Sequence, residues 1–126
     1  MGVRRVYFLA VVYLPPLMVV YNTAIMNTYN LSKQWFEFCA DNMDKIKPAH
    51  TALYFYCIDL CNKFRWKKEF YLPTTHTMSI LGIHSYNTYK VALKDLIEFG
   101  FITMVKKSTN QYNSNIIALS KFDEAN

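Results

Sequence analysis

The residues that could act as nucleophiles or acid–base catalysts are scattered in this sequence. The three histidines have no Cys, Ser or carboxylate at a spacing typical of a catalytic triad: they are His50, His76 and His84. Asp95 and Glu98, three residues apart, fit a solvated helix face. The chain has only three glycines, and they form no loop that could hold a phosphate. We therefore expect no enzyme active site and no cofactor.

The cysteines do not suggest a metal site either. Cys39, Cys57 and Cys61 are odd in number and form no CxxC motif. Cys57 and Cys61 are four residues apart in an apolar segment with helical periodicity, so we expect buried, reduced thiols, as in a cytoplasmic protein. A metal ion would need more ligands than this segment offers.

Two short segments are instead rich in side chains that form hydrogen bonds or attract anions. The first contains Ser85, Tyr86, Asn87, Thr88, Lys90, Val91 and Lys94. The second contains Lys106, Lys107, Ser108, Thr109, Asn110, Gln111 and Tyr112. Between residues 63 and 112 there are eight basic and three acidic residues, whereas the charges elsewhere cancel. A basic half of this kind suits a polyanionic partner.

Length and composition predict one folded domain around these segments. The chain has 126 residues, of which 52% are hydrophobic and 18% charged. This composition argues against disorder, and the length allows one domain with a substantial core.

Two helices are expected before the first segment. Ser32 is a suitable N-cap, and apolar residues at helical spacing then predict an amphipathic helix that ends near Lys47: Trp35, Phe38, Cys39, Met43 and Ile46. Pro48 begins a second helix, extending to Phe64, which is apolar nearly all round. Such a helix must be covered on more than one side, by neighbouring helices or by a second protomer.

The following residues predict a strand and two helices joined by a tight turn. A short strand is expected at 70–72. Pro73-Thr74-Thr75 then starts a short helix, His76 to Leu81, with apolar Met78, Ile80 and Leu81. Gly82 ends this helix, and Ile83 is expected to be a buried turn residue. Ser85 caps the next helix, 86–99, which ends at Gly100. Its inward face is expected to contain Tyr89, Ala92, Leu93 and Leu96.

A hairpin is expected after Gly100. Residues 101–105 and 116–119 have strand composition, and the polar residues between them, 106–115, suit a loop. Helix, glycine turn, helix and hairpin in this order predict a winged helix-turn-helix over residues 48–120. The predicted fold class is mainly α with a small β-wing, a winged helix-turn-helix preceded by an extra N-terminal helix. Such a fold predicts binding of double-stranded DNA.

The chain also resembles a known family. The resemblance is carried by Leu53-Tyr-Phe-Tyr, Asn62, Trp66, Phe70-Tyr-Leu, Leu81-Gly-Ile-His-Ser, Thr88, Leu96 and Gly100-Phe-Ile. These residues are similar to the N-terminal winged-helix domain of DnaD-like replication-initiation proteins, with related domains in phages and mobile elements, over about residues 31–120. The resemblance implies that the recognition helix and wing grip DNA. It also implies a homodimer, formed through the N-terminal helix and the helix at 48–64.

Two features depart from the family. Val91 stands where the recognition helix usually has a basic residue, and the C-terminal helical domain of DnaD-like proteins has no counterpart here. Two alternatives to DNA binding therefore stay open. The first is a winged-helix protein-interaction module in a replication or phage assembly, and the second is a membrane-anchored regulator. Replication initiation and transcriptional regulation are not distinguished.

Position suggests a role for each candidate residue in DNA binding. Ser85 and Thr88, at the helix N-terminus, suit a phosphate, and Lys90 and Lys94 are also expected on phosphates. Asn87 could pair with adenine, whereas Tyr86 or Val91 could touch a thymine methyl group. Lys106 and Lys107, at the root of the wing, favour phosphate or minor-groove contacts.

The first 25 residues differ from the rest. Arg4 and Arg5 precede sixteen uncharged residues, 6–21, which Pro15 and Pro16 interrupt. An over-extended start, a signal or membrane segment, and an element packed on the domain all stay open. Met26 opens a polar sequence that would make a natural N-terminus. We therefore divide the chain into an apolar leader, 1–25, and a DNA-binding domain, 26–126.

Overall fold

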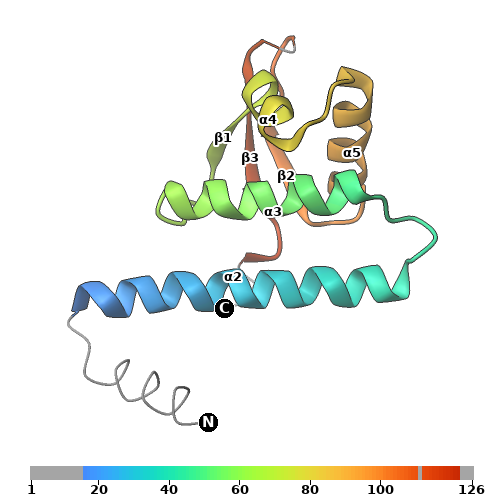
Figure 1. Ribbon diagram of the computed structural model, residues 1–126. Helices are drawn as coiled ribbons and strands as arrows, with labels where there is room; N and C mark the ends of the chain where they lie inside the picture. Colours follow the sequence, from blue (N-terminus) through green and yellow to red (C-terminus); the bar gives the residue numbers. More distant parts are fainter. Residues whose placement is uncertain (1–15, 111, 123–126) are drawn as a thin grey trace.

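The computed structural model describes residues 16–110 and 112–122, in which helices pack around a small sheet (Figure 1). The helices are α2 (Pro16–Asp41), α3 (Pro48–Lys63), α4 (Thr74–Leu81) and α5 (Tyr86–Glu98). The strands β1 (Phe70–Pro73), β2 (Ile102–Lys106) and β3 (Ser114–Leu119) form an antiparallel sheet in the order β1-β3-β2. The prediction of a mainly helical chain with a small β element is confirmed.

The helix α3 lies in the middle of the fold. In Figure 1, α2 runs along one side of it in the opposite direction, and the sheet, α4 and α5 lie on the other side. Leu53, Tyr54 and Cys57 are therefore completely buried. The prediction that this helix needs cover on more than one side is confirmed, and the described part of a single chain provides that cover.

The prediction for α2 is wrong at both ends. Ser32 is not an N-cap, because it lies within a continuous helix and its Oγ donates a hydrogen bond of 2.8 Å to the Thr28 carbonyl. Residues 25 and 26, at which we divided the chain, are consecutive residues of this helix. It begins at Pro16, where proline is tolerated because the first N–H groups of a helix lack intrahelical partners. Residues 1–15 lie outside the described residues.

The C-terminal end of α2 comes earlier than expected. The helix ends at Asp41, and the Asn42 side chain donates a hydrogen bond of 2.9 Å to the Phe38 carbonyl. This polar closure uses a carbonyl that the helix end leaves unpaired. Met43 therefore lies outside the helix and is 79% exposed, whereas Trp35 is buried as predicted.

The two helices around the glycine turn are as expected, with one difference. Gly82 ends α4 with a left-handed φ of 68°, and the Ser85 hydroxyl accepts the Thr88 N–H at the start of α5. In α4, however, the structure buries Thr74 and Thr77 and leaves Ile80 exposed. The helix is turned so that its threonines, rather than its isoleucine, meet the core.

The inward face of α5 is confirmed. Its four predicted residues are all buried: Tyr89, Ala92, Leu93 and Leu96. They are spaced three and four residues apart, so they form one stripe on the helix. In the turn before α5, Ile83 is half-buried rather than fully buried.

The sheet contains one irregularity. In the pairing of β2 with β3, Met104 lies opposite Ile117 and Lys106 lies opposite Ile116, so Val105 is an extra residue. A bulge of this kind increases the local twist and changes the direction of the side chains that follow it. It lies where β2 enters the loop.

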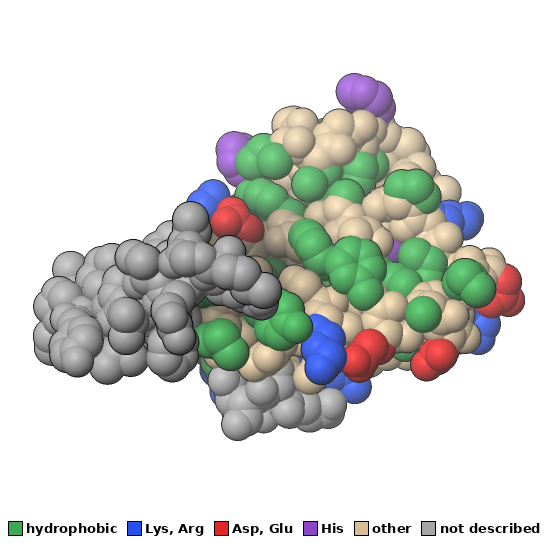
Figure 2. Space-filling view, turned by 60° about the horizontal axis from the view of Figure 1, so that its bottom comes forward, with side chains coloured by type: hydrophobic (Ala, Val, Ile, Leu, Met, Phe, Trp, Pro, Cys, Tyr) green, Lys and Arg blue, Asp and Glu red, His purple; other side chains and the backbone are tan. Residues whose placement is uncertain are grey.

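The outward face of α2 remains apolar. Ile25, Tyr29 and Phe36 share one side of the helix and are 40%, 60% and 54% exposed. Phe36 also packs against Phe55 of α3, with ring centroids 5.6 Å apart. Figure 2 brings this side of the molecule forward and shows hydrophobic side chains exposed among acidic and basic ones.

We predict that Leu96→Ala lowers the free energy of unfolding by about 2–5 kcal/mol, because the Leu96 side chain is completely buried in the hydrophobic core. Leu93→Ala should act in the same range. Lys94→Ala, in the same helix but exposed, is the control. Chemical denaturation measures all three, and equal effects of Leu96→Ala and Lys94→Ala would contradict this packing.

Candidate nucleic-acid interface

The exposed face of α5 carries the first group of candidate residues. Asn87, Val91 and Lys94 are exposed and fall opposite the buried stripe of this helix. Ser85 and Thr88 are also exposed, and the Ser85 hydroxyl accepts the Thr88 N–H at 3.3 Å. This cap leaves other N–H groups of the first turn unpaired within the helix, and such groups can receive an anion.

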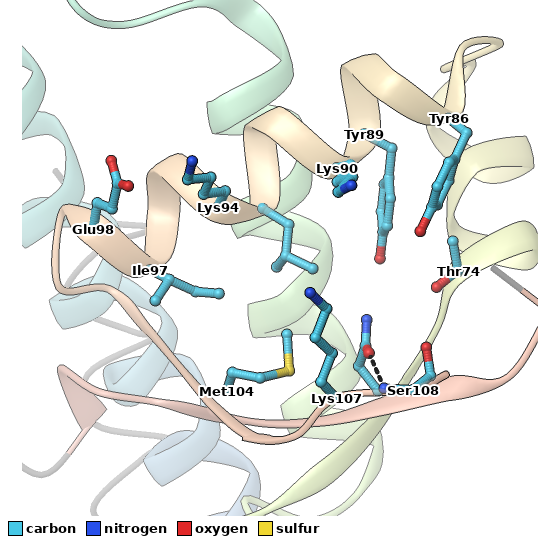
Figure 3. A pocket seen from close by; sticks show the side chains of 12 residues that line it. Thr74, Tyr86, Tyr89, Lys90, Lys94, Ile97, Glu98, Met104, Lys107 and Ser108 are labelled. Atoms are coloured by element: carbon cyan, nitrogen blue, oxygen red, sulfur yellow. Dashed lines mark hydrogen bonds between the residues drawn. The ribbon is translucent and has the colours of Figure 1, made fainter. Parts of the chain in front are cut away.

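The other candidates on α5 border a cleft. Tyr86, Lys90 and Lys94 line one wall, and Lys107 lines the other, from the β2–β3 hairpin. Figure 3 shows Lys107 extending from the hairpin toward α5, with the Tyr86 and Tyr89 rings side by side. The structure thus brings lysines from both predicted segments to one place.

The two hairpin lysines differ in position. Lys107 lines the cleft, whereas Lys106, its neighbour, pairs with Ile116 in the sheet and is not part of the lining. Both side chains are exposed. The bulge at Val105 precedes both lysines and interrupts the regular alternation of side chains between the two faces of β2. In the sequence the two lysines look equivalent, because a bulge leaves no clear signal there.

The tip of the hairpin is held by its own polar side chains. Asn110 Oδ1 accepts the backbone N–H groups of Tyr112 and Asn113, at 2.8 and 3.1 Å. The Ser108 hydroxyl donates a hydrogen bond to the Asn110 carbonyl. These side chains, both candidates for contacting a ligand, therefore stabilise the loop. Tyr112 is 78% exposed, and Gln111 lies outside the described residues.

A buried histidine, whose role sequence reasoning missed, ties α5 to the start of α3. The His50 ring is 2% exposed, and its Nε2 lies 2.9 Å from Asp95 Oδ2. Its Nδ1 accepts the Lys47 N–H at 2.9 Å, so Nε2 carries the proton that is donated to Asp95. The pair joins the start of α3 to α5. We had expected Asp95 to lie on a solvated face together with Glu98. This expectation is wrong for Asp95, because its carboxylate is paired with the buried His50 ring.

The position of His50 in the sequence gave a partial signal for the His50–Asp95 pair. His50 is the third residue of a helix that begins at Pro48, a position from which a side chain can reach back to the N-cap. Its second partner is 45 residues away in the sequence, and only the folded chain reveals it.

Cys57 and Cys61 are buried free thiols, as predicted, and Cys39 is a half-buried free thiol. Burial raises the pKa of the Cys61 thiol to about 12. Burial, with a smaller contribution from Cys61, also raises the pKa of Cys57 far above its ordinary value. Both thiols are protonated at neutral pH and are poor nucleophiles in this state.

Neither a metal cluster nor a membrane span is found in the part of the chain that the structure describes. These residues contain no group of three or more His, Cys, Asp and Glu side chains that could hold a metal ion. Within residues 16–110 and 112–122, no helix combines the length and apolar character needed to cross a membrane.

Comparison with known proteins identifies no relative. No protein-family model matches the chain, and no curated protein or solved structure is significantly similar to it. Function must therefore be inferred from this chain's own sequence and geometry.

We predict that Asp95→Ala destabilises the protein by about 1–3 kcal/mol, because it leaves the buried His50 ring without its Nε2 acceptor. Asp95→Asn retains a side-chain oxygen and should cost less. Glu98→Ala removes an exposed carboxylate from the same helix and should change stability by no more than about 0.5 kcal/mol. Thermal melts of the three variants measure this, and equal melting temperatures would show that the pair does not hold α5.

Proposed function

We propose that this chain is a winged helix-turn-helix protein that binds double-stranded DNA, in replication initiation or transcriptional regulation. In this proposal α4 and α5 are the helix-turn-helix, α5 is the recognition helix, and the β2–β3 hairpin is the wing. The element order and the left-handed Gly82 turn support it. So does the resemblance of the sequence to DnaD-like winged-helix domains.

One observation carries the proposal: an exposed helix face and a basic hairpin border the same cleft. Lys90 and Lys94 come from α5 and Lys107 from the wing, with Glu98 the acidic residue of the lining. Asp95, whose carboxylate accepts a hydrogen bond from His50, does not line the cleft. Converging lysines on two elements suit the closely spaced phosphates of a duplex.

The stripe opposite the buried face of α5 is suited to reading bases. A major groove about 12 Å wide admits one helix, and the N-terminal residues of a recognition helix meet the base edges. Asn87 is in the first turn of α5 and exposed, and Val91 is one turn further along the same stripe. The amide of Asn87 can pair with adenine, while Val91 offers an apolar contact to a thymine methyl group. The lysines supply affinity, and Asn87 supplies sequence preference.

The proposal includes a homodimer, formed through the apolar outward face of α2 and the adjoining Phe55 of α3. Lys33 and Glu37 are exposed on α2 next to the Phe36 side of the helix. In an antiparallel pair of α2 helices centred near residue 35, Lys33 of each chain faces Glu37 of the other. This arrangement buries Phe36 of both chains and pairs all four charges, so the face is complementary to a second copy of itself.

The proposal is one of binding without catalysis, in the cytoplasm.

We predict that Asn87→Ala and the double variant Lys106→Ala/Lys107→Ala weaken DNA binding in different ways. Loss of Asn87 should cost about 1–3 kcal/mol on the preferred site and little on random DNA, because it removes a base contact. Loss of the lysines should weaken binding to all sequences and reduce the log–log salt slope by about one unit for each phosphate that is no longer neutralised. A site selected from random duplexes, followed by salt titrations in fluorescence anisotropy, measures both effects.

Lys68→Ala is the control for this experiment. Lys68 is exposed in the connection between α3 and β1, away from α5. If all variants stay folded and bind DNA as the parent does, this face does not contact DNA. The protein-interaction module would then be the better account of the fold.

We predict that Phe36→Glu converts the dimer to a monomer, because it places a carboxylate at the centre of the proposed contact. Met43→Glu is the matched control, since Met43 is a still more exposed hydrophobic residue outside α2. Light scattering coupled to size exclusion measures the mass, and circular dichroism checks the fold. A parent chain that is monomeric at every concentration tested would rule out this contact.

A further inference from the structure

The cleft between α5 and the hairpin has an apolar floor. It encloses about 370 Å³, and Leu93, Ile97 and Met104 are among its lining residues. Figure 3 shows Ile97 and Met104 between the two elements. Sites for small organic molecules have volumes from about 300 Å³ upward and are lined mainly by apolar side chains. A duplex is too large to enter a cleft of this size, and a phosphate would gain nothing from an apolar floor.

The rim of the cleft is positively charged. Lys90, Lys94 and Lys107 line it with one carboxylate, that of Glu98. Because apolar walls lower the local dielectric constant, an anion beside these ammonium groups interacts with them more strongly than it would in water. The rim therefore favours an acidic head group on an apolar body.

A buried hydroxyl in the same cleft adds an independent observation. The Tyr89 side chain is 1% exposed and lines the cleft, and its Oη makes no hydrogen bond with proper geometry to any described residue. Burial, with a smaller contribution from Cys57, raises the pKa of the Tyr89 phenol, and a hydrogen-bonding interaction with the Thr74 side chain, outside good geometry, opposes this rise. The phenol thus stays protonated at neutral pH and can donate to a ligand. An unpaired buried hydroxyl is costly, and a bound acceptor would relieve that cost.

We propose that this cleft binds a small carboxylic acid with an aromatic or branched apolar body. The body occupies the space beside Met104, and the carboxylate lies among the lysines of the rim. A polar substituent on the body accepts the hydrogen bond of Tyr89. Binding of the acid depends only on the cleft.

A regulatory consequence depends in addition on the DNA-binding function proposed above. Lys90, Lys94 and Lys107 are the lysines that we assign to phosphates, and a bound carboxylate would neutralise part of their charge. The acid therefore competes with DNA, and a cellular metabolite of this class would release the protein from its site. Fewer available cations mean fewer counterions released on DNA binding.

The first test measures the ligand in the absence of DNA. Isothermal titration of the full chain with 2-naphthoate should show binding at least tenfold tighter than with 2-naphthalenemethanol or inorganic phosphate. The double variant Lys90→Gln/Lys107→Gln, at exposed positions, should reduce the affinity at least tenfold. Met104→Trp, which fills the space beside the lysines, should also reduce it. Lys68→Gln removes an equivalent charge elsewhere and should bind as the parent does.

Each other outcome overturns the site or part of it. Equal affinity for phosphate would show a simple anion site, and equal affinity for the alcohol would show an apolar cleft in which the lysines have no role. Binding that survives both the lysine variant and Met104→Trp would place the ligand elsewhere. No binding of naphthoate to a folded parent chain would overturn the proposal entirely.

The second test adds DNA. Naphthoate at ten times its dissociation constant should raise the apparent dissociation constant for DNA about tenfold in the parent chain and not in Met104→Trp. If naphthoate binds but DNA affinity is unchanged, the competition is wrong while the site stands. If the chain binds no DNA at all, the DNA-binding proposal fails, and the titration without DNA still decides the site.

Discussion

The packing of Phe99 and Phe101 on either side of Gly100 is the constraint on which the position of α5 depends. Phe101 packs against Trp35, Phe38 and Tyr54, with ring centroids 5.0–5.2 Å apart, and Phe99 packs against Phe38 at 5.0 Å. Rings from α2, α3 and the turn after α5 thus form one cluster, and edge-to-face contacts of this kind are directional. The end of α5 and the beginning of β2 cannot move independently of α2 and α3.

Gly100 makes this arrangement sterically accessible. Its φ of 88° is in the region that favours glycine, and a Cβ added there would meet no atom within 4 Å. Backbone conformation rather than space therefore selects glycine here. The Phe101 N–H donates to the Leu96 carbonyl at 3.0 Å, which closes the helix while the chain reverses into β2. One residue type at one position thus sets the angle between α5 and the hairpin.

Local chemistry explains which parts of the fold could be predicted from the sequence. The Gly82 turn, the Ser85 cap and the buried stripe of α5 depend on neighbouring residues, and each was predicted at the right position. The start of α2 was not predicted correctly, because serine is a residue type typical of helix N-caps. Only the hydrogen bond from the Ser32 hydroxyl to the Thr28 carbonyl shows that the helix continues through Ser32. The His50–Asp95 pair, the Val105 bulge and the cleft arise from residues distant in the sequence. Periodicity carries no information about such contacts.

Contacts that only the folded chain reveals also separate polar residues with a structural role from those available for binding. Asp95 and Asn110 looked equivalent to their exposed neighbours in the sequence, yet Asp95 is tied to a buried ring and Asn110 to two backbone N–H groups. A polar group that already has good partners gains little by exchanging them for a ligand, since the new contact must first replace the old one. Asn87 and the lysines around the cleft are exposed instead. Lys90, Lys94 and Lys107 thus bring exposed donors from α5 and from the root of the hairpin to one cleft.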